Sequence, residues 1–166
     1  MGDTAMVLKT AKDMGIEFPI VSEYAIVGHE FIQLAGTYGE GLVTTSLKAL
    51  VAHDLPDEDI QKTIAVDLYD SYTEKYENFS LYAGHAWDSL MLLRKALEKT
   101  DPGLDPGQDT DLKKIRIQVR NNFEKHQNIV GQNGIFNYSP DNHNGLPYGC
   151  YVPVIIQDGT WKLSSF

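Results

Sequence analysis

Two stretches of the sequence place side chains where they could bind a small ligand. Glu23 belongs to the triplet Ser22-Glu23-Tyr24, which follows the apolar run FPIV, and Tyr82 lies just before an apolar helix that contains Trp87. In open α/β sheets, ligands bind beyond the carboxyl ends of the strands, where a carboxylate can pair with a cationic group. A solvated acid at Glu23 and a packing role for Tyr82 are the alternatives, and position alone favours them.

The patterns that mark enzymes and metal sites are missing from the sequence. No two histidines stand three or four residues apart, as two ligands on one helix face would; they are His29, His53, His85, His126 and His143. There is no G-x-S-x-G elbow, Walker loop or dinucleotide-binding fingerprint. The single cysteine, Cys150, excludes an internal disulfide and a cysteine-rich zinc site. We expect no catalytic residue, no metal and no cofactor.

The composition is that of an ordinary globular protein, with 42% hydrophobic and 22% charged residues among 166. The formal net charge of -9 argues against a nucleic-acid partner, which would require a basic surface. No apolar run approaches the roughly 20 residues of a membrane span. The chain begins with an amphipathic helix and lacks a basic segment followed by an apolar one, so we expect no signal peptide in it.

Helices and strands alternate in the first 46 residues. The order is a helix at about Thr4–Met14, a buried strand that runs into a loop at Phe18–Ile26, a short helix at Gly28–Gly36 and a strand at Gly41–Ser46. Such alternation is typical of βαβ units, and it predicts a parallel sheet.

Three amphipathic helices are expected next. They cover about Asp57–Tyr76, Leu81–Lys99 and Asp111–His126. The second should bury the apolar stripe that consists of Ala83, Ala86, Trp87, Leu90, Leu93 and Leu97. The chain then ends in short strands at 135–138, 151–156 and 161–163, and Asp158-Gly159 predicts a tight hairpin between the last two.

Four stretches, taken in order, resemble one protein family. They are GDTAMVLKTAKDMGIEFPIVSE, AGTYGEGLVTTS, LYAGHAWDSLMLLRKALEK and GQNGIFNYSPDNHNGLPYGCYVPVIIQDGTWKL. They are similar to the C-terminal portion of the branched-chain amino-acid-binding proteins, the type I periplasmic substrate-binding subunits of ABC transporters. The resemblance implies an α/β class and a partial type I periplasmic-binding-protein fold, with pieces of two parallel-sheet lobes and a C-terminal β-hairpin.

The resemblance also implies a division of the chain. Residues 1–45 would belong to the second lobe, 46–145 to the helical part of the first lobe with one strand, and 146–166 to a hinge return and the second-lobe hairpin. Family members are more than twice as long, so this chain would be a fragment. Because missing strands leave open sheet edges and uncovered apolar faces, we expect the fragment to form a homo-oligomer.

The family's binding residues carry over at two positions, Glu23 and Tyr82. Glu23 matches the acid that accepts the ligand's α-ammonium group, Tyr82 matches an aromatic residue of the side-chain pocket, and Tyr24 is a weaker candidate. The resemblance implies a non-enzymatic solute-binding component of an importer for amino acids or related small carboxylates. It would work with an ABC permease in a periplasmic or other extracytoplasmic location. The alternative is a ligand-sensing receptor domain of the same fold.

Overall fold

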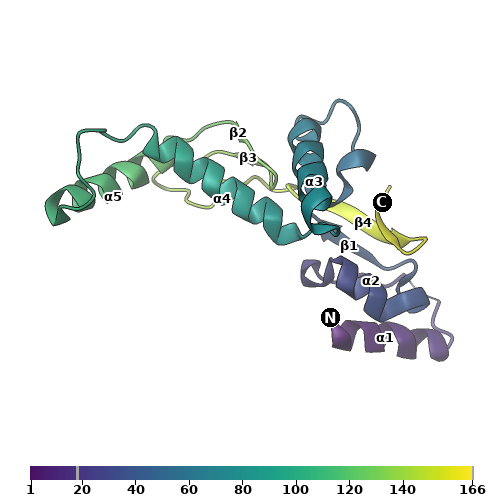
Figure 1. Ribbon diagram of the computed structural model, residues 1–166. Helices are drawn as coiled ribbons and strands as arrows, with labels where there is room; N and C mark the ends of the chain where they lie inside the picture. The colour runs from purple at the N-terminus through teal and green to yellow at the C-terminus, as the bar shows by residue number, and fades with distance from the viewer. Residues whose placement is uncertain (18, 166) are drawn as a thin grey trace. The chain divides into compact units, whose positions relative to one another are not determined.

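The computed structural model describes residues 1–17 and 19–165 and divides into two compact units. Unit 1 comprises residues 1–84 and 151–166, and unit 2 comprises residues 85–150. The elements of unit 1 are α1 (Gly2–Asp13), η1 (Tyr24–Ile26), α2 (His29–Ala35), η2 (Gly36–Gly39), β1 (Val43–Ser46), η3 (Lys48–Asp54), α3 (Lys62–Tyr76), β4 (Val152–Gln157) and β5 (Thr160–Leu163). Helix α4 (Leu81–Leu97) begins in unit 1, and unit 2 contains the rest of it, α5 (Asp109–Phe123), β2 (Ile129–Val130) and β3 (Ile135–Phe136) (Figure 1).

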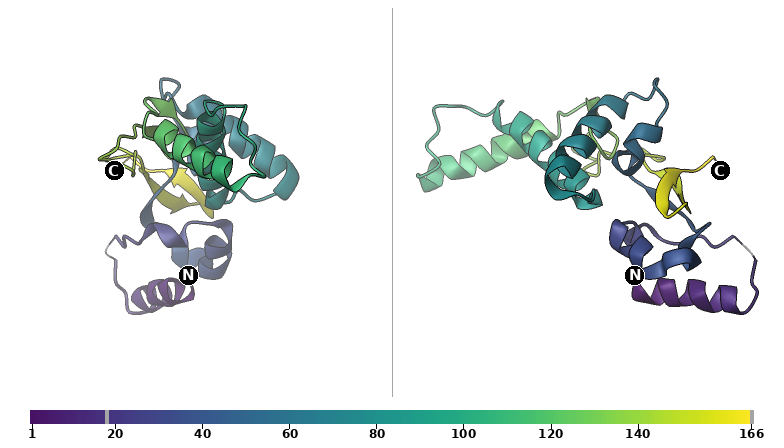
Figure 2. Two further views of the ribbon diagram at one scale, coloured as in Figure 1. Left: turned by 90° about the vertical axis from the view of Figure 1, so that its left-hand side faces the viewer. Right: turned by 45° about the vertical axis from the view of Figure 1, so that its right-hand side comes forward.

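The helices expected near the N-terminus are confirmed. Helix α1 buries Ala5, Leu8 and Ala11, which stand three residues apart and therefore share one face. Helix α2 buries Phe31 and Ala35, four residues apart. Figure 2 shows these two helices side by side, consistent with the residues of both that join one apolar core.

The buried strand that was expected to run into a loop over residues 18–26 is reduced to a single bridge before the loop, and Phe18 itself lies outside the described residues. Only Val21 forms a parallel bridge, with Val43, where the Ser22 N–H donates to the Val43 carbonyl at 2.9 Å. The chain then turns into η1. The apolar run was misleading because Val21 is 73% exposed, so this segment is not the buried strand that the run suggested.

The three-stranded sheet of unit 1 has the order β1-β4-β5 and is antiparallel. Within the described residues, the parallel pairing expected from the alternation is limited to the Val21 bridge, because β1 pairs with a strand from the far end of the chain. The predicted hairpin is confirmed. Asp158 and Gly159 both have positive φ, at 53° and 68°, as a type I′ turn requires. The Glu40 carboxylate accepts both of their N–H groups, at 3.0 and 2.7 Å.

The apolar core of unit 1 lies between this sheet and helices α1 and α2. Phe31, Leu42, Val154 and Ile156 are at most 1% exposed. The indole of Trp161 stacks on Phe31, with ring centroids 6.4 Å apart, and its Nε1 donates to the Gly28 carbonyl at 3.1 Å. This contact fixes the start of α2 against the C-terminal hairpin.

The acidic helix is shorter than expected. Helix α3 begins at Lys62 rather than near Asp57, and Ile60, which precedes it, is 63% exposed. The Asp59 carboxylate accepts the Gln61 N–H at 2.9 Å, which stabilises a turn at the place where the helix was expected to start. The preceding η3 packs beneath α3, where Ala49, Ala52 and Ala65 share a second apolar cluster.

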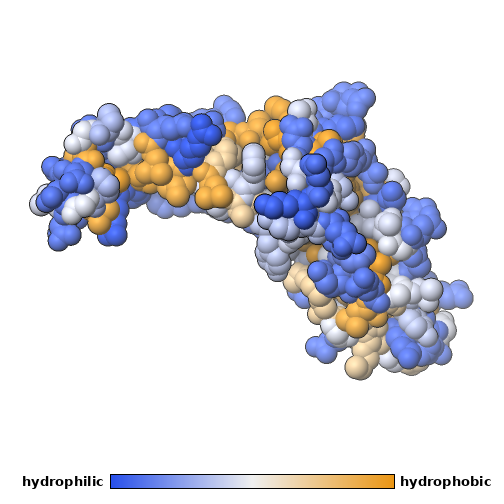
Figure 3. Space-filling view, viewed as in Figure 1, coloured by the Kyte–Doolittle hydropathy of each residue, from blue (hydrophilic) through white to orange (hydrophobic). Residues whose placement is uncertain are grey.

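Helix α4 buries the opposite face from the one predicted. Trp87 and Leu90 are 51% and 68% exposed, whereas Asp88, Leu92 and Ala96, at four-residue spacing, are buried. Figure 3 shows the resulting apolar surface along α4. The expectation for the stripe containing Trp87 is therefore wrong, because the helix is apolar on two sides and only one is covered.

A buried carboxylate fixes the covered face of α4. Asp88 accepts the N–H groups of Gln132 and Asn133 at 2.7 and 2.8 Å. These residues belong to the turn between β2 and β3, which pair over only two residues each. A Cβ at Gly131 would lie 2.6 Å from Asp88 Oδ1, so the turn approaches α4 closely enough to require glycine.

Candidate functional site

A pocket of about 480 Å³ lies within unit 1, and we call it the tyrosine pocket. Its lining includes four tyrosines, one phenylalanine and one carboxylate; the residues are Met1, Tyr24, Ala25, Val27, Gly28, Glu30, Tyr72, Tyr76, Asn78, Phe79, Ser80, Leu81 and Tyr82. Its volume lies in the range of small-molecule sites. Such sites typically combine hydrophobic and aromatic side chains with a small number of polar groups, and both kinds are present in this lining.

Three segments distant in sequence position the aromatic rings. Tyr72 and Tyr76 are one turn apart on α3, with ring centroids 4.8 Å apart. Helix α3 ends at Tyr76, and the positive φ of 68° at the C-cap residue Glu77 turns the chain back. Phe79 then packs edge-on against Tyr72 at 5.5 Å. The turn therefore brings the start of α4 next to the end of α3.

Tyr24 contributes from η1 and is partly buried. Its ring contacts Tyr151 edge-on at 5.2 Å, which holds it in place. Burial raises the pKa of the Tyr24 hydroxyl well above its usual range, and the nearby hydroxyls of Tyr151 and Tyr82 add to the effect. The hydroxyl is therefore protonated at neutral pH and can donate a hydrogen bond to a solute.

The structure brings together two of the three predicted ligand-binding residues. Tyr24 and Tyr82 both line the tyrosine pocket, and Tyr82 is 75% exposed, so a ligand can reach it. Glu23 is the N-cap residue of η1 and has an exposed side chain that is outside the lining. Its role in ammonium binding stays a prediction.

Glu30 is the pocket residue that the sequence reasoning missed. It stands in the first turn of α2, a helix that its apolar residues mark as a core element. A Cβ atom added to Gly28 would lie 3.0 Å from Glu30 Oε2, so the carboxylate folds back over that glycine. An acid two residues after a glycine, at the start of a short helix, is the only local signal, and it is a weak one.

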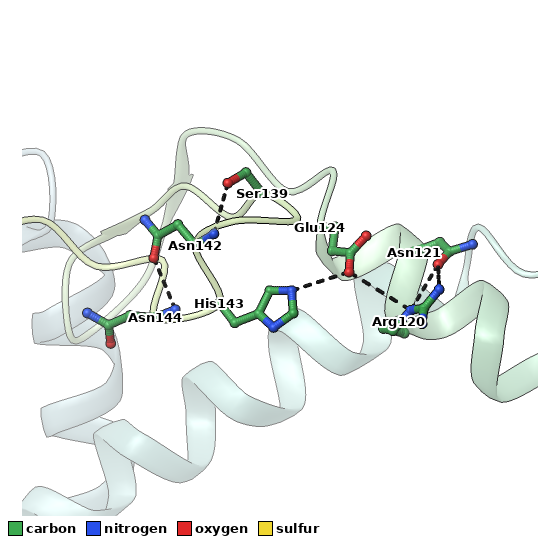
Figure 4. A network of polar contacts seen from close by, with 7 residues as sticks. All are labelled: Arg120, Asn121, Glu124, Ser139, Asn142, His143 and Asn144. Carbon is green, nitrogen blue, oxygen red and sulfur yellow. Dashed lines mark hydrogen bonds and ion pairs between the residues drawn. The ribbon is translucent and has the colours of Figure 1, made fainter.

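A second polar cluster lies in unit 2 and is shown in Figure 4. The Glu124 carboxylate lies 3.2 Å from His143 Nε2 and 3.9 Å from Arg120 Nε. The Arg120 guanidinium also donates to Asn121 Oδ1, at 2.6 Å from Nη2. Arg120 and His143 are exposed, and such surface ion pairs contribute at most about 1 kcal/mol. This cluster is a surface network whose charges already pair with one another.

Among residues 1–17 and 19–165, no three His, Cys, Asp or Glu side chains converge in a way that could hold a metal ion. In the same residues, no helix combines the length and apolar character needed to cross a membrane. The tyrosine pocket is the candidate site because it combines aromatic rings with a carboxylate in one cavity.

Solved structures that match nearly the whole chain are ligand-binding proteins. An extracellular ligand-binding receptor from Rhodopseudomonas palustris aligns with 99% of this chain, and the alignment covers 45% of the receptor chain, with a TM-score of 0.85 and 21% identity. A leucine binding protein from Thermotoga maritima matches 98% of this chain and 41% of its own, with a TM-score of 0.70 and 21% identity. The chain has part of the type I periplasmic-binding-protein fold.

The same type I fold is found in a branched-chain amino acid transporter substrate binding protein from Streptococcus pneumoniae, solved in complex with isoleucine. It matches 98% of this chain and 42% of its own, with a TM-score of 0.68 and 20% identity. The fold class implied by the sequence is confirmed, and the chain spans less than half the length of these proteins. No protein-family model and no curated protein matches the sequence.

Proposed function

We propose that the chain is part of a solute-binding protein that captures an amino acid or a related small carboxylate and delivers it to an ABC permease. It acts without catalysis, in a periplasmic or other extracytoplasmic location. The tyrosine pocket carries the proposal, because it combines a volume of about 480 Å³ with tyrosine rings and a carboxylate. The proteins of the same fold that bind leucine or isoleucine support the choice of solute.

The pocket offers only part of what an amino acid requires. Its described lining contains no Lys, Arg or His side chain that could pair with the carboxylate of the solute. We therefore expect the 166-residue chain to bind free amino acids weakly, with dissociation constants of about a millimolar or more. A stronger complex would require a carboxylate-binding group outside this pocket.

Saturation-transfer NMR with leucine, isoleucine and valine tests the proposal, because it detects weak binding. We expect Tyr82→Ala to change the order of preference among the three solutes, since Tyr82 lines the pocket. Glu23→Gln should weaken binding by about 10-fold or more if Glu23 accepts the ammonium group. Unchanged affinity would remove Glu23 from the site, and no transfer to any of the solutes would contradict the proposed function.

The second candidate is a ligand-sensing receptor domain, because a matching structure carries that kind of description. The pocket serves both functions, so the partner distinguishes them. Neighbouring genes for a permease and an ATPase would favour transport, and a neighbouring gene for a kinase or regulator would favour sensing.

A further inference from the structure

We propose that Tyr151 is a positioning residue that couples the binding of a solute in the tyrosine pocket to the order of residues 149–151. In these residues the chain passes from unit 2 back to unit 1. The inference rests on the proposed function and goes beyond it, because it assigns a role to a residue outside the pocket lining and predicts a local response to the solute.

The contact between the rings of Tyr24 and Tyr151 links the pocket to this segment. Tyr24 lines the pocket, whereas Tyr151 is outside the lining. Their ring centroids lie 5.2 Å apart with an angle of 67° between the planes, which is the edge-on arrangement that aromatic pairs prefer. Because a side chain in contact with a neighbour has fewer accessible rotamers, Tyr151 favours the rotamer in which Tyr24 lines the pocket.

The short helix that carries Tyr24 does not fix the ring by itself. Helix η1 has only three residues, and within residues 1–17 and 19–165 its N-cap residue Glu23 makes no side-chain capping hydrogen bond. A single 3₁₀ turn orders the backbone only locally. The rotamer of Tyr24 therefore depends on tertiary contacts such as that with the ring of Tyr151.

The segment that carries Tyr151 lies between a strand and a turn. Strand β4 begins at the next residue, Val152, which pairs with Ser46 of β1. Before it, Gly149 has a φ of 81°, a left-handed conformation that glycine adopts readily. Tyr151 itself is 40% exposed, so burial is not its main contribution. Its ring contact with Tyr24 is the feature through which a solute in the pocket can influence this segment.

The coupling between pocket and segment follows from thermodynamic linkage. A solute that binds more tightly when Tyr24 holds the rotamer in contact with Tyr151 also stabilises that contact. The contact in turn raises the affinity for the solute by the same factor. The affinity for the solute and the order of residues 149–151 should therefore change together.

Cys150 reports on this segment, because it is the single cysteine of the chain and lies next to Tyr151 in the sequence. It is free and partly exposed, so its rate of alkylation by iodoacetamide depends on how often the segment opens. We expect an excess of leucine to slow this alkylation by about 5-fold, at the lower end of typical coupling factors. Mass spectrometry of the 166-residue chain measures the rate, and saturation-transfer NMR measures the affinity for leucine.

Variants of Tyr151 separate its ring from its hydroxyl. Tyr151→Ala should abolish the protection of Cys150 and lower the affinity for leucine by about 5-fold. Tyr151→Phe keeps the ring and should retain both. Tyr148→Ala is the control, because Tyr148 is fully exposed, lies close to Cys150 in the sequence and is outside the lining. If Tyr151→Ala does not fold, Tyr151→Leu, which keeps an apolar side chain without a ring, should show the same losses.

Three outcomes would contradict these expectations in different ways. Leucine that binds without slowing alkylation of the wild-type chain would overturn the coupling. Protection that survives in Tyr151→Ala, or that is lost equally in Tyr151→Phe or Tyr148→Ala, would overturn the role of the Tyr151 ring. Failure of leucine, isoleucine and valine to bind would instead contradict the proposed function, and with it the solute to which Tyr151 responds.

Discussion

Unit 1 and unit 2 differ in what they bury. Both apolar clusters belong to unit 1, where residues such as Phe31, Leu47 and Ile156 are almost fully inaccessible. Most buried side chains of unit 2 are polar: Asp88, Asn122, His126, Gln132 and Asn133. Its buried apolar side chains are Leu92, Ala96 and Phe136. Four large apolar side chains of α4 are exposed instead: Trp87, Leu90, Leu93 and Leu97.

This difference shows that the two units reach stability by different means. Apolar burial contributes about 25 cal/mol per Å² and dominates in unit 1. Unit 2 depends more on hydrogen bonds to buried groups, whose net contribution is about 1 kcal/mol each. An apolar helix face that stays exposed is typical of a surface that contacts another polypeptide. The comparison therefore indicates that unit 2 is the less complete part.

The largest expected effect is self-association of the isolated chain. In a purified sample, a second copy can cover the face of α4 that carries Trp87, Leu90 and Leu97. We expect a dimer or higher oligomer that buries more than about 2,000 Å², the range of obligate interfaces. Light scattering coupled to size-exclusion chromatography measures the mass.

The double variant Leu90→Glu with Leu97→Glu should shift that sample toward monomer, because it places charges on the exposed face. Leu34→Glu is the control, since Leu34 is 57% exposed on α2 in unit 1. A wild-type chain that stays monomeric at micromolar concentration would show that the apolar face of α4 does not mediate association.

The next effect concerns the apolar core of unit 1. Phe31→Ala removes a fully buried ring that stacks on Trp161, so we expect the free energy of unfolding to fall by about 3–5 kcal/mol. Urea unfolding monitored by tryptophan fluorescence measures the change. Leu34→Ala on the same helix should change it by less than about 0.5 kcal/mol, because that side chain is largely exposed. Equal losses in the two variants would contradict the position of the core.

The sequence predicts those features that depend on neighbouring residues, and it fails for features that depend on contacts between distant parts of the chain. The helix that buries Leu8 and the hairpin at Asp158-Gly159 were predictable because spacing and turn residues act over a few positions. The covered face of α4 was not, because Asp88 finds its partners in a turn 44 and 45 residues later in the sequence. The start of α3 was misplaced because Asp59 stabilises a turn where apolar spacing suggested a helix.

The candidate site was predictable in part for the same reason. Tyr82 was selected through a resemblance that aligns it with a binding residue, and Tyr24 as a weaker candidate beside Glu23; both line the pocket. Glu30 was not selected, because a carboxylate becomes a site residue only when three distant segments meet around it. The position of Tyr76 on an acidic helix likewise gave no indication of a ligand.

A polar change in unit 2 should have a smaller effect than the loss of Phe31. Asp88→Ala leaves the N–H groups of Gln132 and Asn133 without their acceptor in a buried place, so we expect a loss of about 2–3 kcal/mol. Amide hydrogen exchange at these two residues should accelerate, which NMR can follow. The control is Glu98→Ala on the same helix, which removes only an exposed pair with Arg94, worth about 0.3–0.5 kcal/mol. Unchanged exchange in Asp88→Ala would show that the turn is held by other contacts.

The smallest expected effect is a pH dependence of unit 2 through His126. Its ring is 1% exposed, packs against Phe123 and Tyr138, and has neither nitrogen hydrogen-bonded within the described residues. Burial lowers the pKa of His126, and the charges of Lys99 and Lys95 lower it further. The folded protein therefore keeps this ring neutral at a pH where the unfolded chain binds a proton, so stability is lost as the pH falls below the unfolded value of about 6.5.

Urea unfolding at several pH values measures this dependence, and a single proton allows a slope of at most about 1.4 kcal/mol per pH unit. His126→Phe should flatten the slope between pH 7.5 and 5.5, because it removes the group that the unfolded chain protonates. His143→Gln is the matched control, since His143 is exposed and contacts only the surface carboxylate of Glu124. If the two variants change the slope equally, the burial of His126 does not account for the pH dependence. A slope that flattens only in His126→Phe would show that the buried polar side chains of unit 2 make it sensitive to acid. Hydrogen exchange within residues 85–150 would then report the same dependence on pH.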